Sequence, residues 1–467
     1  MIVVLGAGPA GLAAAYKLAV ERRRPVTVVE RQARVGGNAA SFVIDGIPVD
    51  FGSHRLHPST SPVVMADIRH LLGDDLLDRP RHGRIRLRGQ WVHFPLKPVD
   101  LALHLPPAFA LGVVGDLLRK PFAGAPAASS FASILERGLG RTICRDFYFP
   151  YATKIWGQDP DALDPEQARR RVGNSSIGKM IGRVLGAVPG LKKPGAGRFF
   201  YPRRGFGQIS DAYASAAVSA GATLLLNTAV SRIDVERGAV QRVVVTTEGV
   251  DRVLDTTQVL STIPLPLLTR LVHDVDRPAP LMEAAQLQQR AMVLIYLTLE
   301  AEQFTEFDAH YFPETSIRIS RLSEPKNYSQ TPKPGRTVLC AELPCNTTDD
   351  VWTQSDAELA QLVVRDLEQA GLGPVPQVLA AEAVRLPHAY PLYTRGYRSA
   401  FDTLDRWVSA VAGLVTFGRQ GLFVHDNTHH TIAMAYALVD CLGADGRCDE
   451  GRWAEARRGF EGHVVED

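Results

Sequence analysis

The sequence predicts an α/β protein in which a Rossmann-like parallel-sheet domain is interleaved with helical and antiparallel-sheet substrate domains. Three observations support this prediction. Residues 2–5 form an apolar run typical of a strand covered on both faces, and a glycine-rich turn and an Ala/Leu-rich helix follow it. A second glycine pair, at 36–37, follows the next predicted strand. Two longer strand patterns, 292–299 and 337–343, indicate an antiparallel sheet over a pocket.

The N-terminal turn carries a nucleotide-binding pattern. Residues 6–11 read Gly-Ala-Gly-Pro-Ala-Gly, which matches Gly-x-Gly-x-x-Gly. The pattern alone is weak evidence, but here it lies between a strand and a helix, and Glu30 follows about 20 residues later. This context predicts a dinucleotide site. The alternative is a phosphate-free turn of an ordinary doubly wound sheet.

Each residue of the pattern has a physical role. Gly6 permits the tight turn, Gly8 lets a pyrophosphate approach the backbone, and Gly11 lets the helix pack closely on the strand. The helix N-terminus offers N–H groups and the positive end of a dipole to the phosphates. Glu30 would accept hydrogen bonds from a ribose.

The residues after Glu30 favour FAD over NAD. Residues 34–38 read Arg-Val-Gly-Gly-Asn, and residues 50–57 read Asp-Phe-Gly-Ser-His-Arg-Leu-His. Together with the N-terminal pattern they resemble the flavoprotein family that includes amine oxidases, protoporphyrinogen oxidase, phytoene desaturases and UDP-galactopyranose mutase. In that family the glycine pair packs against the FAD pyrophosphate and the next loop faces the isoalloxazine. The resemblance implies a glutathione-reductase-like FAD-binding domain, whereas the glycine pair alone would also suit a plain β-turn.

The C-terminal part extends this resemblance. Residues 414–417 have a strand pattern, Gly418-Arg419 ends it, and residues 432–438 have helical spacing. In the family such a strand, turn and helix close the flavin site, with the helix N-terminus near N1 and O2, where its dipole would stabilise anionic reduced flavin. The backbone of Val230 would hold the adenine. The expected cofactor contacts are Gly6, Gly8, Gly11, Glu30, Arg31, Gly36, Gly37, Asn38, His54, Val230, Gly418, Arg419, Asn427 and Thr431.

We expect three domains, two of them built from separate stretches of chain. Residues 164–185 are helical by composition, and the Gly/Pro-rich segment 188–197 predicts a mobile loop. The expected boundaries are 1–80, 200–270 and 410–467 for the FAD-binding domain, 100–199 for a helical substrate-side domain, and 81–99 and 271–409 for an antiparallel-sheet substrate domain.

Several segments resemble the UDP-galactopyranose mutase branch more than the amine oxidases. Residues 151–157 (Tyr-Ala-Thr-Lys-Ile-Trp-Gly) are similar to its Tyr-Thr-x-Lys-Gln-Trp-Gly segment. Residues 321–328 (Arg-Leu-Ser-Glu-Pro-Lys-Asn-Tyr) are similar to its Arg-Ile-x-Glu-His-Lys-x-Phe segment. The resemblance implies pyranose–furanose isomerisation of a nucleotide-activated sugar, with N5 of reduced flavin as the nucleophile.

The resemblance also implies roles for single residues. Trp156 would stack on the nucleobase, and two arginines would bind the diphosphate by charge-assisted hydrogen bonds. Because none of these residues belongs to the glycine pattern, we expect their replacement to leave folding and FAD content unchanged. The expected catalytic residues are His57, Arg170 and Arg321, and the expected substrate contacts are Tyr151, Trp156, Arg170, Arg321, Tyr390 and His425.

The sequence also departs from the mutase pattern. His425 stands where a tyrosine is expected, and residues 427–429 replace an acid-Met-acid run. A second hypothesis therefore stays open, an FAD-dependent oxidoreductase (amine oxidase, dehydrogenase, protoporphyrinogen oxidase or desaturase) that transfers hydride from its substrate to flavin. A non-catalytic FAD-bound scaffold is a third. NAD(P)H or another reductant is a further candidate partner. The alternative to a binding role for Trp156 is that of a core aromatic. The alternative for Arg169–Arg171 is a solvated helix face.

Composition excludes several classes of protein. The content of 45% hydrophobic and 22% charged residues suits a soluble globular chain, and the net charge of +2 gives no general affinity for nucleic acid.

The five cysteines are scattered without a Cys-x-x-Cys pair, so we expect a cytoplasmic protein without disulfides or structural zinc. Prolines and polar residues interrupt the apolar stretch 101–118, so no stable membrane insertion is expected. His425, His429 and His430 form no recognised ligand motif, so no metal is expected.

Overall fold

The computed structural model describes residues 1–94, 104–119, 130–172, 197–331 and 333–465. The predicted mobile loop at 188–197 and the second half of the predicted helical segment 164–185 lie almost wholly outside these residues. No helix in the described part of the chain is long and apolar enough to cross a membrane.

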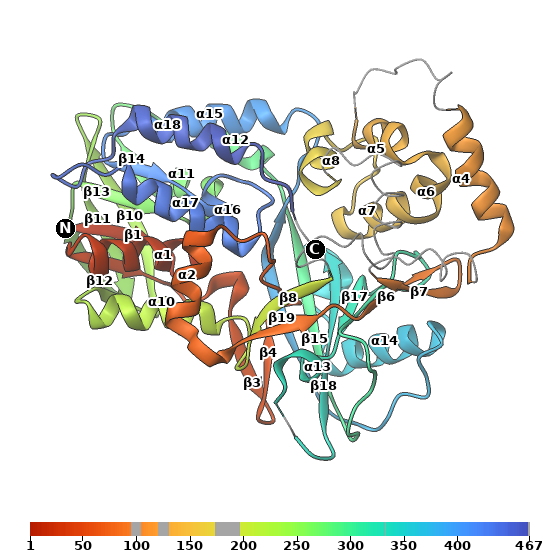
Figure 1. Cartoon of the computed structure of the whole chain (residues 1–467). Helices are drawn as coiled ribbons and strands as arrows, with labels where there is room; N and C mark the ends of the chain where they lie inside the picture. The colour runs from red at the N-terminus through yellow and green to blue at the C-terminus, as the bar shows by residue number, and fades with distance from the viewer. Residues whose placement is uncertain (95–103, 120–129, 173–196, 332, 466–467) are drawn as a thin grey trace.

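A five-stranded parallel sheet forms the centre of the first domain. Its strands come from the beginning, middle and end of the chain and pair in the order β20-β13-β1-β2-β9. Figure 1 shows these red, green and blue segments together at one end of the molecule. The strands are β1 (Ile2–Leu5), β2 (Val26–Val29), β9 (Thr223–Leu225), β13 (Gln258–Ser261) and β20 (Leu414–Thr416).

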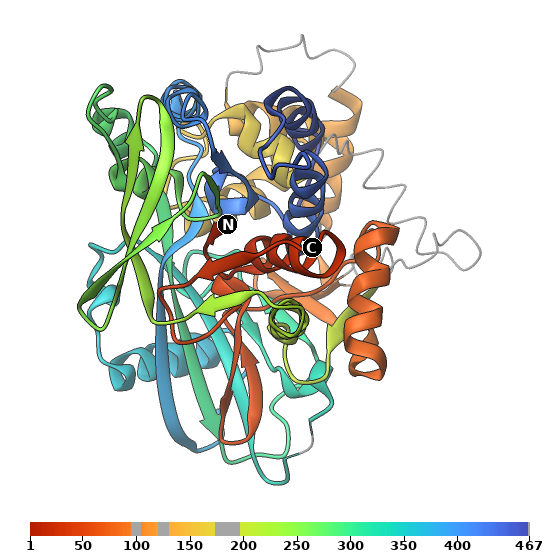
Figure 2. The same ribbon diagram turned by 90° about the vertical axis from the view of Figure 1, so that its left-hand side faces the viewer.

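Both faces of this sheet are covered, which explains the apolar runs. Ile2 and Val4 of β1 face a helical layer, whereas Val3 and Leu5 face the opposite layer. Figure 2 shows α1 and α17, from the two ends of the chain, next to each other. The helical layer contains α1 (Pro9–Tyr16) with η1 (Lys17–Glu21), α2 (Pro62–Leu72), α10 (Gln208–Ser219), α17 (Thr428–Asp440) and α18 (Glu450–Phe460).

The opposite layer is a four-stranded sheet together with three helices. We predicted that residues 271–409 belong to the antiparallel-sheet domain, but α12 and α15 pack in the same core as the parallel sheet. Buried side chains of α15, such as Leu404 and Val408, belong to the core that also contains residues of the parallel sheet. The position of these residues in the sequence does not reveal which sheet they pack on. The elements are β10 (Thr228–Glu236), β11 (Ala239–Thr247), β12 (Val250–Asp255), β14 (Val272–Asp274), α11 (Leu265–Leu271), α12 (Leu281–Gln286) and α15 (Tyr397–Ser409).

A seven-stranded, mainly antiparallel sheet forms the second domain, in the order β19-β15-β18-β17-β16-β6-β7. One face packs on α14 (Asp356–Gln369), and the other packs on the hairpin of β3 (Ser41–Ile44) and β4 (Ile47–Asp50). The strands are β6 (Gly83–Leu87), β7 (Gln90–Phe94), β15 (Gln289–Leu299), β16 (Ala309–Tyr311), β17 (Arg321–Ser323), β18 (Thr337–Cys345) and β19 (Val378–Pro391).

A group of helices forms the third part, and Figure 1 shows it beside the antiparallel sheet and away from most of the parallel sheet. A small core of apolar side chains, including Leu135, Ile155 and Trp156, holds these helices together. They are α4 (Pro107–Arg119), α5 (Phe131–Leu139), α6 (Arg141–Ile143), η5 (Cys144–Tyr148), α7 (Phe149–Trp156) and α8 (Pro165–Val172). The remaining short elements are η2 (Gly37–Ala39), η3 (Gly73–Asp75), β5 (Leu76–Pro80), β8 (Arg198–Pro202), α13 (Lys326–Ser329), η6 (Asp350–Trp352) and α16 (Gly418–Gly421).

Candidate functional site

The two glycine elements face each other at the N-terminus of α1. Gly11 packs so tightly on the first turn that a Cβ there would lie 2.0 Å from the Gly6 carbonyl oxygen. A Cβ at Gly8 would meet no protein atom within 4 Å, whereas a Cβ at Gly37 would lie 3.5 Å from the Gly8 Cα. The Gly36 N–H donates to the Ala7 carbonyl at 2.7 Å and fixes the second element on the first. The open space over Gly8, at a helix N-terminus, fits a pyrophosphate.

Glu30 lies buried at the carboxyl end of β2, where a ribose is expected. Its carboxylate accepts hydrogen bonds from the Ala7 N–H at 2.8 Å and from the Gln32 N–H at 2.9 Å. The Thr228 N–H, at the start of β10, donates to the Glu30 carbonyl at 2.9 Å. The strand that carries Val230 therefore begins at the same edge of the sheet as Glu30. Arg31 follows Glu30 in the chain and is exposed.

The segments around Asn38, His388 and Gln420 close the other end of the expected cofactor site. Asn38 Nδ2 and Gln420 Nε2 both donate to the His388 carbonyl, at 2.8 and 2.9 Å. The Nε2 atom of His54 lies 2.9 Å from the carbonyl oxygens of both Asn38 and Phe51. Gly418, at φ +74°, approaches α1 so closely that its Cβ would lie 3.0 Å from the Ala10 Cβ.

Asn427 precedes the first residue of α17, and this helix packs against α1 and α16. The Asn427 N–H donates to Nδ1 of His430 at 3.3 Å, and the Thr431 hydroxyl donates to the Thr428 carbonyl at 2.8 Å. Glu30, Gly37 and Gly418 thus all adjoin residues 7–10 at the start of α1. The donor set and the open glycine backbone fit FAD.

Arginines and aromatic rings gather where the three parts of the fold meet. Arg171 lies over the rings of Trp156 and Tyr390, at 4.9 and 5.3 Å from the ring centroids. Arg419 also lies over the Tyr390 ring, at 5.2 Å from its centroid. The Arg419 Nη2 donates to the Ala389 carbonyl at 2.9 Å. Burial lowers the pKa of the Arg419 guanidinium, and its buried Nε has no hydrogen-bond partner among the described residues.

The predicted Arg321 lies in the same region but already has a protein partner. Its guanidinium forms a buried ion pair with Glu342, with Nε at 2.9 Å and Nη2 at 2.7 Å from the same carboxylate oxygen. Burial alone would lower the pKa of Arg321, but Glu342 outweighs it and holds that pKa well above its usual value. Arg321 therefore has a structural role whatever else it contacts.

Arg55, which the sequence analysis did not select, joins this region. It pairs with Asp308 at 3.2 Å and donates to the Tyr311 hydroxyl at 3.4 Å, and Arg321 lies 6.0 Å from the Tyr311 ring centroid. The signal was present, because Arg55 belongs to the 50–57 segment that carried the resemblance. His57 instead makes local contacts: its Nδ1 lies 2.7 Å from the Ser59 hydroxyl and accepts the Ser59 N–H at 3.1 Å. These contacts give no support to the catalytic role expected for His57.

Arg170 does not occupy the place that the sequence analysis gave it. Its guanidinium binds Glu166 at 2.9 Å and the Phe460 carbonyl at 2.8 Å, on the side of α8 away from Trp156. The next residue, Arg171, takes the position over Trp156 and Tyr390. Successive helical residues point about 100° apart, so the packing of α8 decides which arginine of the run faces the site.

The nucleobase-stacking role expected for Trp156 does not fit the structure. Trp156 is only 4% exposed, belongs to the core of the helical part, and has Arg171 over its ring. Tyr151 is half-buried and stacks on Phe147, with centroids 5.9 Å apart. Tyr390, by contrast, has the guanidinium groups of Arg171 and Arg419 over its ring, at 5.3 and 5.2 Å from the centroid.

His425 lies in an aromatic box and is 1% exposed. Trp156, Tyr393 and Tyr390 surround it, with ring centroids at 5.0, 4.9 and 6.5 Å. Burial, and then the charges of the surrounding arginines, hold the pKa of His425 well below its usual value. A neutral imidazole therefore stands where the resemblance expects a tyrosine hydroxyl.

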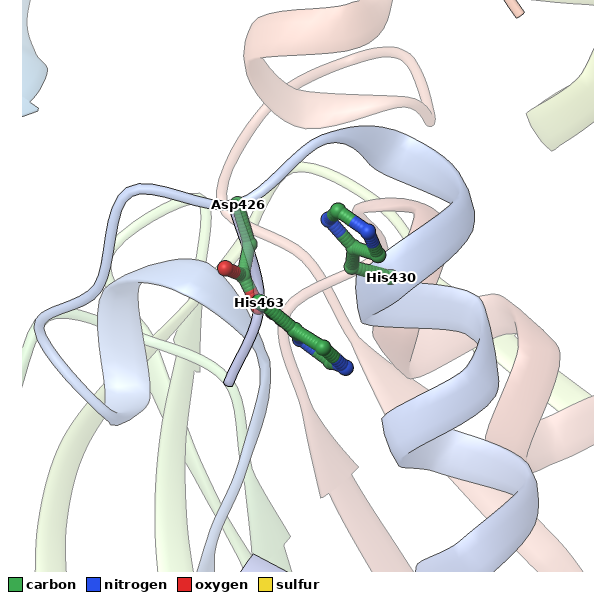
Figure 3. Close-up of side chains that lie close together, drawn as sticks. All are labelled: Asp426, His430 and His463. Atoms are coloured by element: carbon green, nitrogen blue, oxygen red, sulfur yellow. Dashed lines mark hydrogen bonds and ion pairs between the residues drawn. The ribbon is translucent and has the colours of Figure 1, made fainter. Parts of the chain in front are cut away.

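Asp426, His430 and His463 come together behind this box, and Figure 3 shows them. His463 was missed because it lies more than thirty residues further along the chain, in the tail after α18. The ring planes of His430 and His463 are 14° apart with centroids 4.3 Å apart, so their in-plane lone pairs run nearly parallel and do not converge on one ion. The Nδ1 atom of His463 lies 2.9 Å from Asp426 Oδ2. The geometry suits a hydrogen-bonded contact better than a metal centre.

Comparisons with known proteins agree with this arrangement. The family described as flavin containing amine oxidoreductase matches residues 9–437. Protoporphyrinogen oxidase 1 of Arabidopsis thaliana chloroplasts is 23% identical over 97% of this chain and 87% of its own length. The crystal structure of a reduced UDP-galactopyranose mutase superposes with a TM-score of 0.81 at 20% identity, over 100% of this chain and 99% of that one. A putative protoporphyrinogen oxidase from Exiguobacterium sp. 255-15 superposes with a TM-score of 0.72 at 21% identity, over 94% and 97%.

Proposed function

The chain belongs to the flavin-containing amine oxidoreductase family and is an FAD-dependent enzyme, and on this premise we propose that its substrate is a small molecule with two neighbouring anionic groups. The leading candidate reaction is the isomerisation of a nucleotide-activated sugar. FAD supplies a carbon-attacking or hydride-accepting N5 atom when it is bound. The chain's own residues bind and orient the substrate beside it.

One observation carries this proposal. The guanidinium groups of Arg171 and Arg419 both lie over the Tyr390 ring, at 5.3 and 5.2 Å from its centroid, and neither forms an ion pair with a carboxylate of the residues that the structure describes. Asp426 acts on Arg419 electrostatically but forms no ion pair with it. Two guanidinium groups without an ion-paired carboxylate in a partly buried, aromatic region favour an anionic ligand, because the ligand supplies a paired charge and further acceptors. The unpartnered Nε atoms of both arginines are consistent with such a ligand.

A diphosphate and a pair of carboxylates both satisfy this requirement. The likeness to the mutase fold and the similar 151–157 and 321–328 segments support the diphosphate of a nucleotide sugar. The near-full-length similarity to protoporphyrinogen oxidase supports the second candidate, oxidation of a dicarboxylate such as protoporphyrinogen. A cationic amine is disfavoured, because two uncompensated arginines would repel it.

The redox state of the flavin distinguishes the two candidates. An isomerase requires reduced FAD and consumes no reductant in each turnover, whereas an oxidase bleaches oxidised FAD in proportion to substrate. We expect UDP-galactose, added anaerobically to the reduced enzyme, to give a furanose product with no change in flavin absorbance. Stopped-flow absorbance with product analysis measures both quantities. Bleaching of the oxidised enzyme by protoporphyrinogen would instead establish the second candidate.

Arg171→Ala should weaken the binding of an anionic ligand by about 2–4 kcal/mol, because the ligand loses a charge-assisted contact in a partly dry site. The measurement is calorimetric titration of UDP into the FAD-loaded protein. Arg169→Ala is the matched control: it lies on the same helix, is exposed, and pairs only with Glu166 at 3.1 Å, so its replacement should change affinity little. Equal affinities for the two variants would contradict the placement of Arg171 in the site.

A further inference from the structure

The chain after α18 folds back onto α8, the helix that carries Arg171. Arg170 Nη1 donates to the Phe460 carbonyl at 2.8 Å and has a longer contact with the His463 carbonyl at 3.5 Å. In return, the Val465 N–H donates to the Arg170 carbonyl at 2.8 Å. We call residues 461–465 the C-terminal tail. Arg170 is buried, so the tail is attached to the last described turn of α8 through both side chain and backbone.

The tail has a second attachment, at the segment that leads into α17. His463 Nδ1 lies 2.9 Å from Asp426 Oδ2, and its ring stacks on that of His430 at 4.3 Å (Figure 3). Asp426 is 3% exposed, so this contact is shielded from solvent on the carboxylate side. A hydrogen bond to a buried carboxylate is worth more than an exposed ion pair.

Both attachment points are directly next to a residue of the site. Arg170 contacts the tail through the Val465 N–H and the His463 carbonyl, and Arg171 lies over Trp156 and Tyr390. Asp426 binds the tail, and His425 stands in the aromatic box against Trp156. In each pair the residue that contacts the tail and the residue of the candidate site are neighbours in the chain. The tail therefore holds the backbone from which two site residues project.

We propose that the C-terminal tail is a positioning element that holds Arg171 and His425 in the geometry that binds the anionic substrate. This inference rests on the proposed anionic ligand. The described hydrogen bonds of the tail reach none of Gly6, Gly8, Gly11 and the other expected FAD contacts directly. His430, on which His463 stacks, accepts a hydrogen bond from the Asn427 N–H, so one expected FAD contact lies next to the tail. Loss of the tail should weaken substrate binding and leave the flavin content unchanged, because most of the expected FAD contacts lie on other elements. By linkage, a bound anionic ligand stabilises the docked tail to the same extent.

Two variants and one rescue test the proposal in the full FAD-loaded protein. Truncation after Phe460 removes the tail, and His463→Leu removes only the Asp426 contact and the ring stack. We expect UDP to bind about tenfold more weakly to each, a loss of about 1.4 kcal/mol, with unchanged flavin content and absorption spectrum. His463→Asn keeps a donor for Asp426 and should recover most of the affinity. Arg169→Ala, on the same helix but away from the tail, should bind UDP like the wild type.

Hydrogen exchange of residues 165–172 gives a readout that needs no ligand. Truncation should raise the exchange of these amides, because the last turn of α8 loses the hydrogen bond from the Val465 N–H to the Arg170 carbonyl and the Arg170 contact with the His463 carbonyl, although the Phe460 contact stays. Unchanged exchange in α8, or unchanged UDP affinity in both tail variants, would overturn the proposal. A wild-type protein that binds no anionic ligand would defeat the proposed function instead, and the exchange result would still decide whether the tail holds α8.

Discussion

Gly8→Val should yield a folded, colourless protein. The space over Gly8 contains no protein atom within 4 Å of an added Cβ, and its backbone, at φ −74°, is one that valine adopts without strain. The new side chain therefore costs the apoprotein little, but it occupies the place where the pyrophosphate must approach the helix N-terminus. The measurement is the ratio of flavin to protein after reconstitution with FAD, with thermal unfolding of the apoproteins alongside.

Two further glycines make this result specific. Gly11→Val should destabilise the apoprotein itself by about 1–3 kcal/mol or more, because its Cβ would lie 2.0 Å from the Gly6 carbonyl oxygen, a backbone atom that cannot yield. Gly115→Val, in α4 with nothing within 4 Å, should keep both fold and flavin. A yellow Gly8→Val protein with a normal flavin ratio would show that the cofactor does not cross this glycine.

Arg321→Ala should lower the stability of the protein by about 3–5 kcal/mol, because it leaves Glu342 as a buried carboxylate without its counter-ion. The Ser53 N–H, which donates to the same carboxylate at 2.8 Å, does not replace a full charge. From the sequence alone we expect this substitution to leave folding and FAD content unchanged, whereas the ion pair predicts a loss of stability. Urea unfolding monitored by flavin and by tryptophan fluorescence measures the effect.

The double variant Arg321→Met/Glu342→Gln tests the cause. If the loss comes from an uncompensated buried charge, removing both charges should restore much of the stability that Arg321→Ala loses. Arg336→Ala is the control: it breaks the exposed pair with Asp45 and should cost about 0–1 kcal/mol. A double variant no more stable than Arg321→Ala would mean that Arg321 acts through some other contact.

The site also shows why arginines with and without an ion-paired carboxylate must be tested differently. Arg171 and Arg419 lack carboxylate partners among the described residues, so their replacement should act on ligand binding. Arg321 and Arg55 are already paired with Glu342 and Asp308, so their replacement acts first on the protein. An activity loss in an Arg321 variant is therefore informative only when folding and flavin content are measured in the same preparation.

The sequence by itself determined the cofactor site, because that site is built from local backbone conformation. Gly6, Gly8 and Gly11 act within one strand–turn–helix unit, and their spacing requires the turn, the open approach and the close packing that the structure contains. Glu30 follows at the end of the next strand, where its distance along the chain already places it. The family resemblance added the second glycine pair and the C-terminal closure on the same kind of local pattern.

Only the tertiary structure decided the substrate side, because its residues meet across long stretches of chain. The three arginines at 169–171 are equivalent in sequence, and the docking of α8 between Trp156 and the C-terminal tail selects Arg171 for the site and Arg170 for the tail. Arg321 could bind a ligand or a carboxylate until Glu342, on the neighbouring strand β18, is seen beside it. Helix phase, strand neighbours and a returning tail are set by the packing of the whole core, which no local pattern encodes.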